Sequence, residues 1–435
     1  MEKAEILNKI IELSKIYFEK DNLESSFVPF ISKIPVSGKV LDENDLENLI
    51  RSSLDMWLTA GDYTNVFEKK LREKTEIRHA LFVNSGSSAN LLAVTALKEF
   101  YKLDEGDEII TSAVNFPTTL NPIIQNNLTP VLVDVEMGSY NINPRLIEEN
   151  INSRTKGIVL AHTLGNPFNL TEIVALCEKY DLFLMEDMCD AFGSRYENKL
   201  VGTFGDVATL SFYPAHHITT GEGGAVLTNN TKLKKIMESL RDWGRDCYCP
   251  PGEDNTCKKR FDWQLGELPQ GYDHKYIYSH VGYNLKASDM QAAIGVSQIE
   301  KIDEFIHKRI ENFDYIYSKF KEFEEFDLPI WDKDSQPSWF GFPLTVNKNA
   351  NFSRLDLLKY YAEKNIGTRL LFAGNILKQP AYINKNIKSE KSLPNADYVM
   401  ENSFWLGVYP GIDNSMLDFI FNQTKEFIDL HSYKK

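Results

Sequence analysis

Two carboxylates stand directly after a short apolar run. Leu182–Met185 has the composition of a buried strand, and Glu186 and Asp187 follow it at once. A carboxylate at the end of a buried strand can hold an aromatic ring nitrogen protonated, the form in which a cofactor ring accepts electrons. An aspartate at this place can equally cap the next helix. From these residues alone both interpretations stay open.

A turn of small residues, Asn84-Ser85-Gly86-Ser87-Ser88-Ala89-Asn90, precedes a helical pattern. Such a turn presents backbone N–H groups at a helix N-terminus, where a phosphate can bind. The alternative is an ordinary tight connection in which Ser87 is the N-cap.

The segment from Ser211 to Gly224 combines Ser-Phe-Tyr-Pro, two adjacent histidines and Gly-Glu-Gly-Gly. This order resembles the sugar aminotransferases of the fold-type I pyridoxal-phosphate enzymes. In that family a lysine five residues after the serine bonds covalently to the cofactor. Here His216 stands at that position, and no lysine occurs between Lys199 and Lys232. A covalent link to the protein at this point is therefore excluded.

A small branch of that family, the nucleotide-sugar 3-dehydrases, similarly carries histidine at this position and uses pyridoxamine phosphate. The resemblance implies that His216 is a base that removes a proton from the 4′ carbon of the cofactor, a task for which the ordinary pKa of imidazole is suitable. The competing interpretation makes His216 and His217 packing or capping residues.

The resemblance also implies cofactor-binding roles for other residues. Gly86 and Ser87 would bind the phosphate through backbone N–H groups, Ser211 through its hydroxyl, and Asp187 would pair with the ring nitrogen. Phe116 would stack on the ring, although it also suits a plain core position. Asp190 would contact the cofactor or His216. Asn284 would reach the phosphate of a neighbouring subunit, which implies a homodimer with shared sites. The roles of His162, His217 and Glu222 stay open, with a satisfied interior histidine favoured for His162.

Four cysteines follow the spacing C-x57-C-x-C-x7-C: Cys189, Cys247, Cys249 and Cys257. From spacing alone they suggest a 2Fe–2S cluster, a structural zinc or unligated thiols. Similarity to the cluster-containing 3-dehydrases, which have the same spacing, implies the 2Fe–2S cluster. Cys189 lies two residues after Asp187, so such a cluster would be close to the cofactor. Cys177 is expected to be a buried small hydrophobe.

The resemblance implies a substrate and partners as well. The substrate would be a nucleotide-linked 4-keto-6-deoxyhexose, CDP-4-keto-6-deoxyglucose first, which loses its C3 hydroxyl on the way to the 3,6-dideoxyhexoses of O-antigen lipopolysaccharide. The electrons would come through the cluster from an NADH-dependent flavin and iron–sulfur reductase. The alternatives are a cluster-free sugar 3-dehydratase, an aminotransferase-like variant, and a catalytically silent relative that only binds cofactor.

The elements that must position these residues follow an α/β pattern. Seven strand-like runs alternate with helical segments and predict a mostly parallel sheet with helices on both faces. The resemblance implies that this sheet is the seven-stranded large domain of a fold-type I pyridoxal-phosphate transferase. The runs are His79–Val83, Glu108–Thr111, Pro130–Val135, Gly157–Thr163, Leu182–Glu186, Val207–Phe212 and Gly224–Thr228. Ligand sites of such sheets lie at the carboxyl ends of the strands.

The expected domains are an N-terminal helix (1–30), a cofactor-binding domain (31–300) and a smaller α+β domain (301–435). In the last part of the chain we expect a long helix with one break over Ser288–Phe323, a strand at Trp339–Val346, and helices at Leu355–Lys364 and Met416–His431. Residues 242–279 are too irregular for either element and too long for an ordinary connection, which indicates a functional loop.

Composition limits the possible functions. Of 435 residues, 48 are Lys or Arg and 62 Asp or Glu, a net charge of −14 that argues against nucleic-acid binding and anionic membrane surfaces. No apolar run approaches the length of a spanning helix. The charged, amphipathic N-terminus does not resemble a signal peptide, so a cytoplasmic enzyme is expected. Five cysteines in so long a chain do not form a disulfide scaffold.

Overall fold

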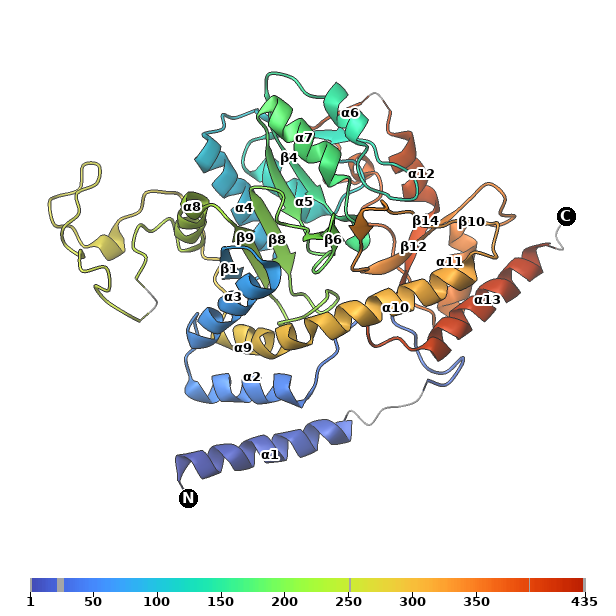
Figure 1. Ribbon diagram of the computed structural model, residues 1–435, viewed down its shortest axis with the longest axis horizontal. Coiled ribbons are helices and arrows are strands. Elements are labelled where there is room, and N and C mark those ends of the chain that lie inside the picture. Colours follow the sequence, from blue (N-terminus) through green and yellow to red (C-terminus); the bar gives the residue numbers. More distant parts are fainter. Residues whose placement is uncertain (1, 22–26, 250–251, 391, 433–435) are drawn as a thin grey trace.

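The computed structural model describes residues 2–21, 27–249, 252–390 and 392–432. Met1, at the start of the expected N-terminal helix, and Pro250, beside Cys249, lie outside the described residues. The largest element is an eight-stranded sheet in the order β1-β9-β8-β5-β4-β2-β3-β13 (Figure 1). Its strands are β1 (His79–Val83), β2 (Glu108–Ser112), β3 (Thr129–Val133), β4 (Thr155–Ala161), β5 (Phe183–Asp187), β8 (Val207–Ser211), β9 (Gly224–Thr228) and β13 (Lys388–Ser389).

The sheet confirms the seven expected strands and adds one. From β8 to β13 every pair is parallel, whereas β9 runs antiparallel to both β8 and β1. The eighth strand, β13, is only two residues long and comes from the C-terminal part of the chain. Its pairing with β3 depends on a distant segment, so no local pattern indicates it.

Helices cover both faces of this sheet, because alternate strand residues enter different cores. Ile158 and Leu160 of β4 belong to one buried cluster, and Val159 belongs to another. The first cluster contains side chains of α3 (Asp62–Thr75) and α7 (Leu170–Tyr180), and the second those of α4 (Gly86–Tyr101) and α8 (Thr231–Arg241). Shorter helices, α5 (Pro117–Gln125), α6 (Pro144–Glu149) and a 3-10 turn η1 (Thr163–Gly165), complete the connections.

A long two-part helix leads into the C-terminal region. The expected break is present: α9 (Asp289–Gln298) and α10 (Ile302–Phe320) are separated by the 3-10 turn η3 (Ile299–Lys301). Beyond α10 a three-stranded antiparallel sheet, β10-β12-β14, packs with further helices around its own core. The elements of this region are β10 (Phe326–Asp327), β12 (Gly341–Val346), α11 (Arg354–Glu363), the turn η4 (Ile376–Lys378), α12 (Pro394–Asn402), β14 (Ser403–Gly407) and α13 (Asn414–Ser432). Of the helices after α10, α11 and α13 contribute to this core, whereas η4 and α12 contribute to a separate buried cluster.

The remaining elements are peripheral. The N-terminal helix α1 (Lys3–Asp21) lies beside α2 (Glu43–Asp55) (Figure 1). A small sheet joins β6 (Arg195–Tyr196), β7 (Lys199–Leu200) and β11 (Ser335–Gln336). Within the described ranges, no helix is long and apolar enough to cross a membrane.

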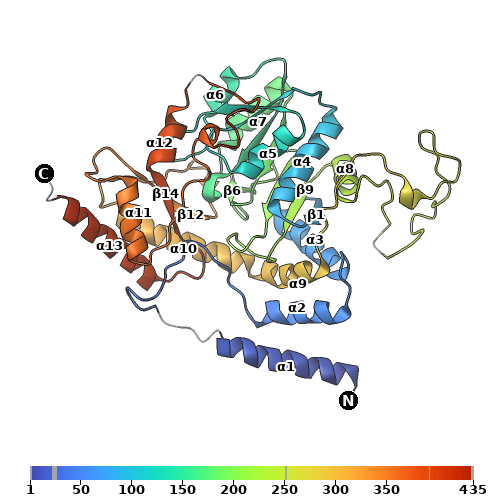
Figure 2. The same cartoon turned by 180° about the vertical axis from the view of Figure 1, so that it is seen from behind.

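The described residues of 242–279 form a loop that leaves the body of the molecule between α8 and α9. Figures 1 and 2 show it extending well beyond α8, away from the large sheet. In the described part of this loop the regular structure is one 3-10 turn, η2 (His274–Tyr276). The prediction of an irregular segment is confirmed.

Candidate active site

Four neighbouring parallel strands end at one edge of the sheet, and chemistry-bearing residues follow each of them. Phe116 follows β2, His162 follows β4, Asp187 ends β5 and Ser211 ends β8. In register, Asp187 lies beside Ala161 of β4 and Thr209 of β8. This edge is where a doubly wound sheet binds its ligand.

Asp187 is buried and firmly oriented. Its Oδ2 accepts hydrogen bonds from Asn90 Nδ2 (2.8 Å) and Thr119 Oγ1 (2.8 Å), and its Oδ1 accepts one from the Cys189 N–H (3.1 Å). Asn90 is held in turn by Thr209, whose hydroxyl donates to Asn90 Oδ1 at 2.6 Å. These donors hold the carboxylate in one orientation at the end of β5. Thr119 and Thr209 had no signal in the sequence, and Asn90 was noted only as the last residue of the small-residue turn.

The start of α4 forms a narrow backbone cradle against β8. A Cβ added to Gly86 would lie 2.5 Å from Ser211 Cβ, so only glycine lets the helix approach this strand. Ser85, not Ser87, is the N-cap: its side chain accepts from the Ser88 N–H at 3.1 Å. The capping alternative for Ser87 is therefore wrong. Among the described residues nothing accepts from the Gly86 and Ser87 N–H groups, which are left for an anion.

His216 lies beside a second buried carboxylate. Its Nδ1 is 3.4 Å from Asp190 Oδ1, without the alignment of a hydrogen bond, and its ring is 5.2 Å from the ring of Phe340. Burial raises the pKa of Asp190 and the nearby His216 opposes that rise. A histidine paired with a carboxylate in this way can accept a proton.

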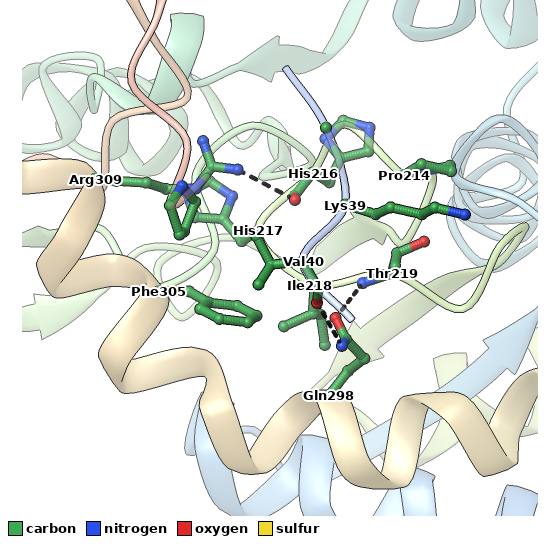
Figure 3. A pocket seen from close by; sticks show the side chains of 12 residues that line it. Lys39, Val40, Pro214, His216, His217, Ile218, Thr219, Gln298, Phe305 and Arg309 are labelled. Carbon is green, nitrogen blue, oxygen red and sulfur yellow. Dashed lines mark hydrogen bonds between the residues drawn. The ribbon is translucent and has the colours of Figure 1, made fainter. Parts of the chain in front are cut away.

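Arg309 of α10 holds the backbone on which His216 stands. Its guanidinium donates to the carbonyls of Ala215 (3.4 Å) and His216 (3.2 Å), and also to those of Trp339 and Phe340. Figure 3 shows the hydrogen bond to the His216 carbonyl. The side chain is buried, which lowers the pKa of Arg309 to about 10. Nothing in the sequence singled out this arginine, because its partners are backbone carbonyls of distant segments.

His162 and His217 are both buried and contact other residues of the protein interior. His162 is fully buried, stacks on Phe168 at 4.2 Å and contacts Glu186 Oε2 through Nε2 at 3.2 Å, as the interior interpretation predicts. His217 Nε2 lies 3.0 Å from the Ser338 carbonyl. Burial, with the charge of Arg309, lowers the pKa of His217 well below its usual value.

Glu186 and Glu222 both accept hydrogen bonds that hold turns in place. Glu186 accepts the N–H groups of Gly202, Phe204 and Gly205, so it fixes a turn rather than facing a ligand. Glu222 uses its carbonyl to accept from the Thr220 hydroxyl (2.7 Å), which closes the glycine turn, and its side chain is exposed.

Phe116 and Asn284 are accessible. Phe116, the residue before α5, is 51% exposed, so the core interpretation of this residue is wrong and its ring is free to stack on a ligand. Asn284 is exposed at the base of the 242–279 loop, where it pairs with Asp242.

The cysteines fall into separate environments. Cys177 is buried in α7, as expected, and burial raises its pKa to about 12. Cys189 lies with Asp187 and Asp190, and burial raises its pKa well above the ordinary value. In the loop, hydrogen bonds from Thr256 and from the neighbouring Cys247 and Cys257 outweigh partial burial and lower the pKa of Cys249 to about 7.

The four-cysteine set is thus not brought together within one chain. Cys247, Cys249 and Cys257 interact with one another, whereas the groups that influence Cys189 are Asp187, Asp190 and Thr209. In the described part of the chain no three His, Cys, Asp or Glu side chains are arranged to hold a metal ion. A 2Fe–2S cluster requires four such ligands, so a single chain in this form does not fit it.

The fold and the strand-end site define the class of fold-type I pyridoxal-phosphate enzymes. Among solved structures, the E. coli GDP-4-keto-6-deoxy-D-mannose-3-dehydratase with bound hydrated PLP superposes with a TM-score of 0.81 at 28% identity and covers 90% of this chain and 98% of that one. Over residues 39–425 the sequence matches the DegT/DnrJ/EryC1/StrS aminotransferase family, and the chain belongs to it.

Two curated relatives are similar over nearly their whole length. The lipopolysaccharide biosynthesis protein RfbH of Salmonella typhimurium is 51% identical over 97% of this chain and 98% of its own. The dTDP-4-dehydro-2,6-dideoxy-D-glucose 3-dehydratase of Saccharopolyspora spinosa is 48% identical over 94% and 90%. The family and these structures support a pyridoxal-phosphate-type cofactor, and the Gly86 cradle with its two open N–H groups fits such a phosphate.

Proposed function

We propose that this protein is a nucleotide-sugar 3-dehydratase that uses pyridoxamine phosphate and removes the C3 hydroxyl of a nucleotide-linked 4-keto-6-deoxyhexose. The observation that carries the proposal is His216, which lies 3.4 Å from the buried Asp190 at the position where aminotransferases of this family have a lysine. The similarity to a dTDP-sugar 3-dehydratase and to a lipopolysaccharide biosynthesis protein supports it. The preference for CDP rests on the sequence resemblance.

Each residue of the site has a distinct task in this proposal. The bound cofactor supplies an amine that condenses with the 4-keto group and a ring that accepts electrons. Asp187, fixed by Asn90 and Thr119, holds the ring nitrogen protonated. Gly86 and Ser87 bind the phosphate through their N–H groups and Ser211 through its hydroxyl.

His216 is the base, and its surroundings suit that role. It accepts the proton from the 4′ carbon of the cofactor, and the carboxylate of Asp190 stabilises the imidazolium that results. Phe116 covers one face of the ring, where its exposed side chain excludes water. Because no lysine is available there to displace the product, loss of the C3 hydroxyl is favoured over transfer of the amine.

The electron supply completes the proposal. A 2Fe–2S cluster on Cys189, Cys247, Cys249 and Cys257 would receive single electrons from an NADH-dependent flavin and iron–sulfur reductase in the cytoplasm, and the enzyme would be a homodimer. The cysteine spacing supports the cluster.

The separation of Cys189 from the loop thiols favours a second candidate, a cluster-free 3-dehydratase. Analysis of iron and acid-labile sulfide in protein purified without oxygen distinguishes the two. About two iron ions per chain support the cluster, and iron-free protein that still dehydrates the sugar supports the second candidate.

The base role is tested by isotope exchange. The protein is incubated in deuterated water with pyridoxamine phosphate and CDP-4-keto-6-deoxyglucose, without reductant, beside dTDP- and GDP-linked sugars. We expect deuterium at the 4′ carbon with one nucleotide, and none in His216→Asn protein that still binds the cofactor. No exchange with any of the three sugars in the unaltered protein would contradict the proposal.

A further inference from the structure

A small cavity borders the histidine loop, residues 212–223 between β8 and β9 (Figure 3). About 10 Å³ of the cavity is open to the centre of a water-sized sphere. That volume is enough for about one ordered water molecule. The lining brings together three separate parts of the chain, which are Gly38–Val40, His216–Thr219 of the histidine loop, and Gln298 and Arg309 of the α9–α10 helix.

Arg309 leaves one hydrogen-bond donor unused at this cavity. A guanidinium has five N–H donors, and those on its two terminal nitrogens bond to four backbone carbonyls, of Ala215, His216, Trp339 and Phe340. The fifth donor, on Nε, has no acceptor among the described residues, although the side chain is only 1% exposed. An unpaired donor on a buried charge is costly, so an acceptor from outside the chain is expected at this atom.

His217 leaves one hydrogen-bond acceptor unused. Its Nε2 lies 3.0 Å from the Ser338 carbonyl, which can only accept, so Nε2 carries the ring proton. Burial and the charge of Arg309 lower the pKa of His217, which keeps the ring neutral and leaves a lone pair on Nδ1. In the part of the chain that the structure describes, nothing donates to Nδ1, and the residue is 2% exposed.

The unused donor and the unused acceptor together specify the ligand. Both side chains line the cavity, and the charge of Arg309 acts on His217. Water can accept a hydrogen bond from Arg309 Nε and donate one to His217 Nδ1. A small anion would be repelled by the lone pair of Nδ1, and a cation would be repelled by the guanidinium.

We propose that one water molecule is bound in this cavity, where it accepts a hydrogen bond from Arg309 Nε and donates one to His217 Nδ1. The water makes His217 a positioning residue for the histidine loop. It completes the hydrogen bonds of the guanidinium whose other donors hold the carbonyls of Ala215 and His216. The importance of this anchor for proton transfer rests on the proposed function, so the tests below measure the water and the backbone rather than activity.

Two replacements of His217 separate the roles of its two nitrogens. His217→Gln places an amide near the position of Nε2, so it keeps a donor for Ser338 and loses the acceptor for the water. His217→Asn places an amide near the position of Nδ1 and has the reverse effect. In crystals that resolve ordered waters, we expect a water within hydrogen-bond distance of Arg309 Nε in the unaltered protein and in His217→Asn. In His217→Gln we expect none.

Amide hydrogen exchange, followed by mass spectrometry, measures the effect on the backbone. The His216 N–H donates to the Tyr213 carbonyl at 2.9 Å, so its exchange reports opening of the histidine loop. We expect amides of this loop to exchange about tenfold faster in His217→Gln, and within about twofold of the unaltered rate in His217→Asn. His307→Gln, on the exposed face of α10, should change neither the water nor the exchange.

Three results would overturn the inference. A cavity without a water in the unaltered protein removes the site. An anomalous bromide peak at Arg309 Nε, in crystals soaked in bromide, identifies an anion site instead of a water site. Equal loosening of the histidine loop in both His217 variants removes the positioning role. None of these results concerns the base role of His216, which the isotope exchange described above tests separately.

Discussion

The strand-end site and the 242–279 loop both carry reactive side chains, but the protein holds them in opposite ways. At the end of β5 each polar group has buried partners in distant elements: Asp187 with Asn90 and Thr119, and the His216 backbone with Arg309. The loop depends on local contacts such as Arg260 with Asp273, and it exposes its aromatic residues. Side chains that need fixed geometry are thus held in the body, and exposed aromatic side chains are located on the loop.

Replacing His216 gives the strongest test of the difference between the strand-end site and the loop. His216→Asn keeps a polar side chain of similar size but removes the base, so we expect proton exchange at the cofactor to fall about 10²–10⁴-fold. The rate of deuterium incorporation measures this. Tyr248→Phe, a loop change of similar conservatism, should leave exchange within about twofold. Equal losses in both variants would show that the loop takes part in the proton transfer.

Arg309→Met tests whether the backbone of His216 is held from α10. The change leaves buried carbonyls without their charged donor, and we expect a loss of about 3 kcal/mol in the free energy of unfolding. Urea denaturation measures the loss. Lys308→Met, its neighbour at the surface of α10, should change stability by less than about 0.5 kcal/mol. A fully stable Arg309→Met protein would contradict the anchoring role.

Gly86→Ala tests the phosphate cradle. The added methyl group would lie 2.5 Å from Ser211 Cβ, so α4 or β8 must shift to accept it. We expect cofactor binding to weaken by about 2 kcal/mol, which is about 30-fold in Kd. Titration followed by absorbance gives the Kd. Gly106→Ala, where the added atom has no neighbour within 4 Å, is the control for the cradle: its φ of +83° costs some stability, but the folded protein should bind the cofactor normally.

His217 gives the body a dependence on pH. Burial lowers the pKa of His217, so below the usual pKa of about 6.5 the unfolded chain binds a proton that the folded chain does not. The free energy of unfolding should therefore decrease as the pH is lowered. The expected decrease from this residue is about 1.4 kcal/mol between pH 7.5 and pH 5.5. Urea denaturation at the two pH values measures this decrease. In His217→Gln protein the difference between the two free energies of unfolding should be smaller by that amount. His307→Gln, an exposed site on α10, should leave the difference unchanged.

The smallest effect is expected in the loop. Phe261→Ser removes an exposed aromatic ring that belongs to none of the buried cores, so thermal unfolding of the body should change by less than about 0.5 kcal/mol. A larger loss would mean that the loop packs on the body of its own chain, and the contrast between the two regions would fail.

Much of the site was predictable because its signals are local. The strand patterns placed Asp187 and Ser211 at strand ends, and the replacement of lysine by His216 is visible in the sequence alone. The alternative that made Ser87 the N-cap was two residues from the actual cap, Ser85, because both serines suit an N-cap and backbone geometry chooses between them. Arg309 and Thr119 were missed, since an arginine or threonine inside a helix has no pattern that marks its partner.

The sequence by itself determined which residue types stand where: the alternating elements, the histidine at the lysine position and the cysteine spacing. Local periodicity and turn chemistry involve only a few neighbouring residues, so they can be recognised from the sequence without a structure. Only the tertiary structure decided which distant groups meet, as when Asn90 and Thr119 converge on Asp187. It also separated Cys189 from the three loop thiols, because contacts across long stretches of chain are selected by the packing of whole elements.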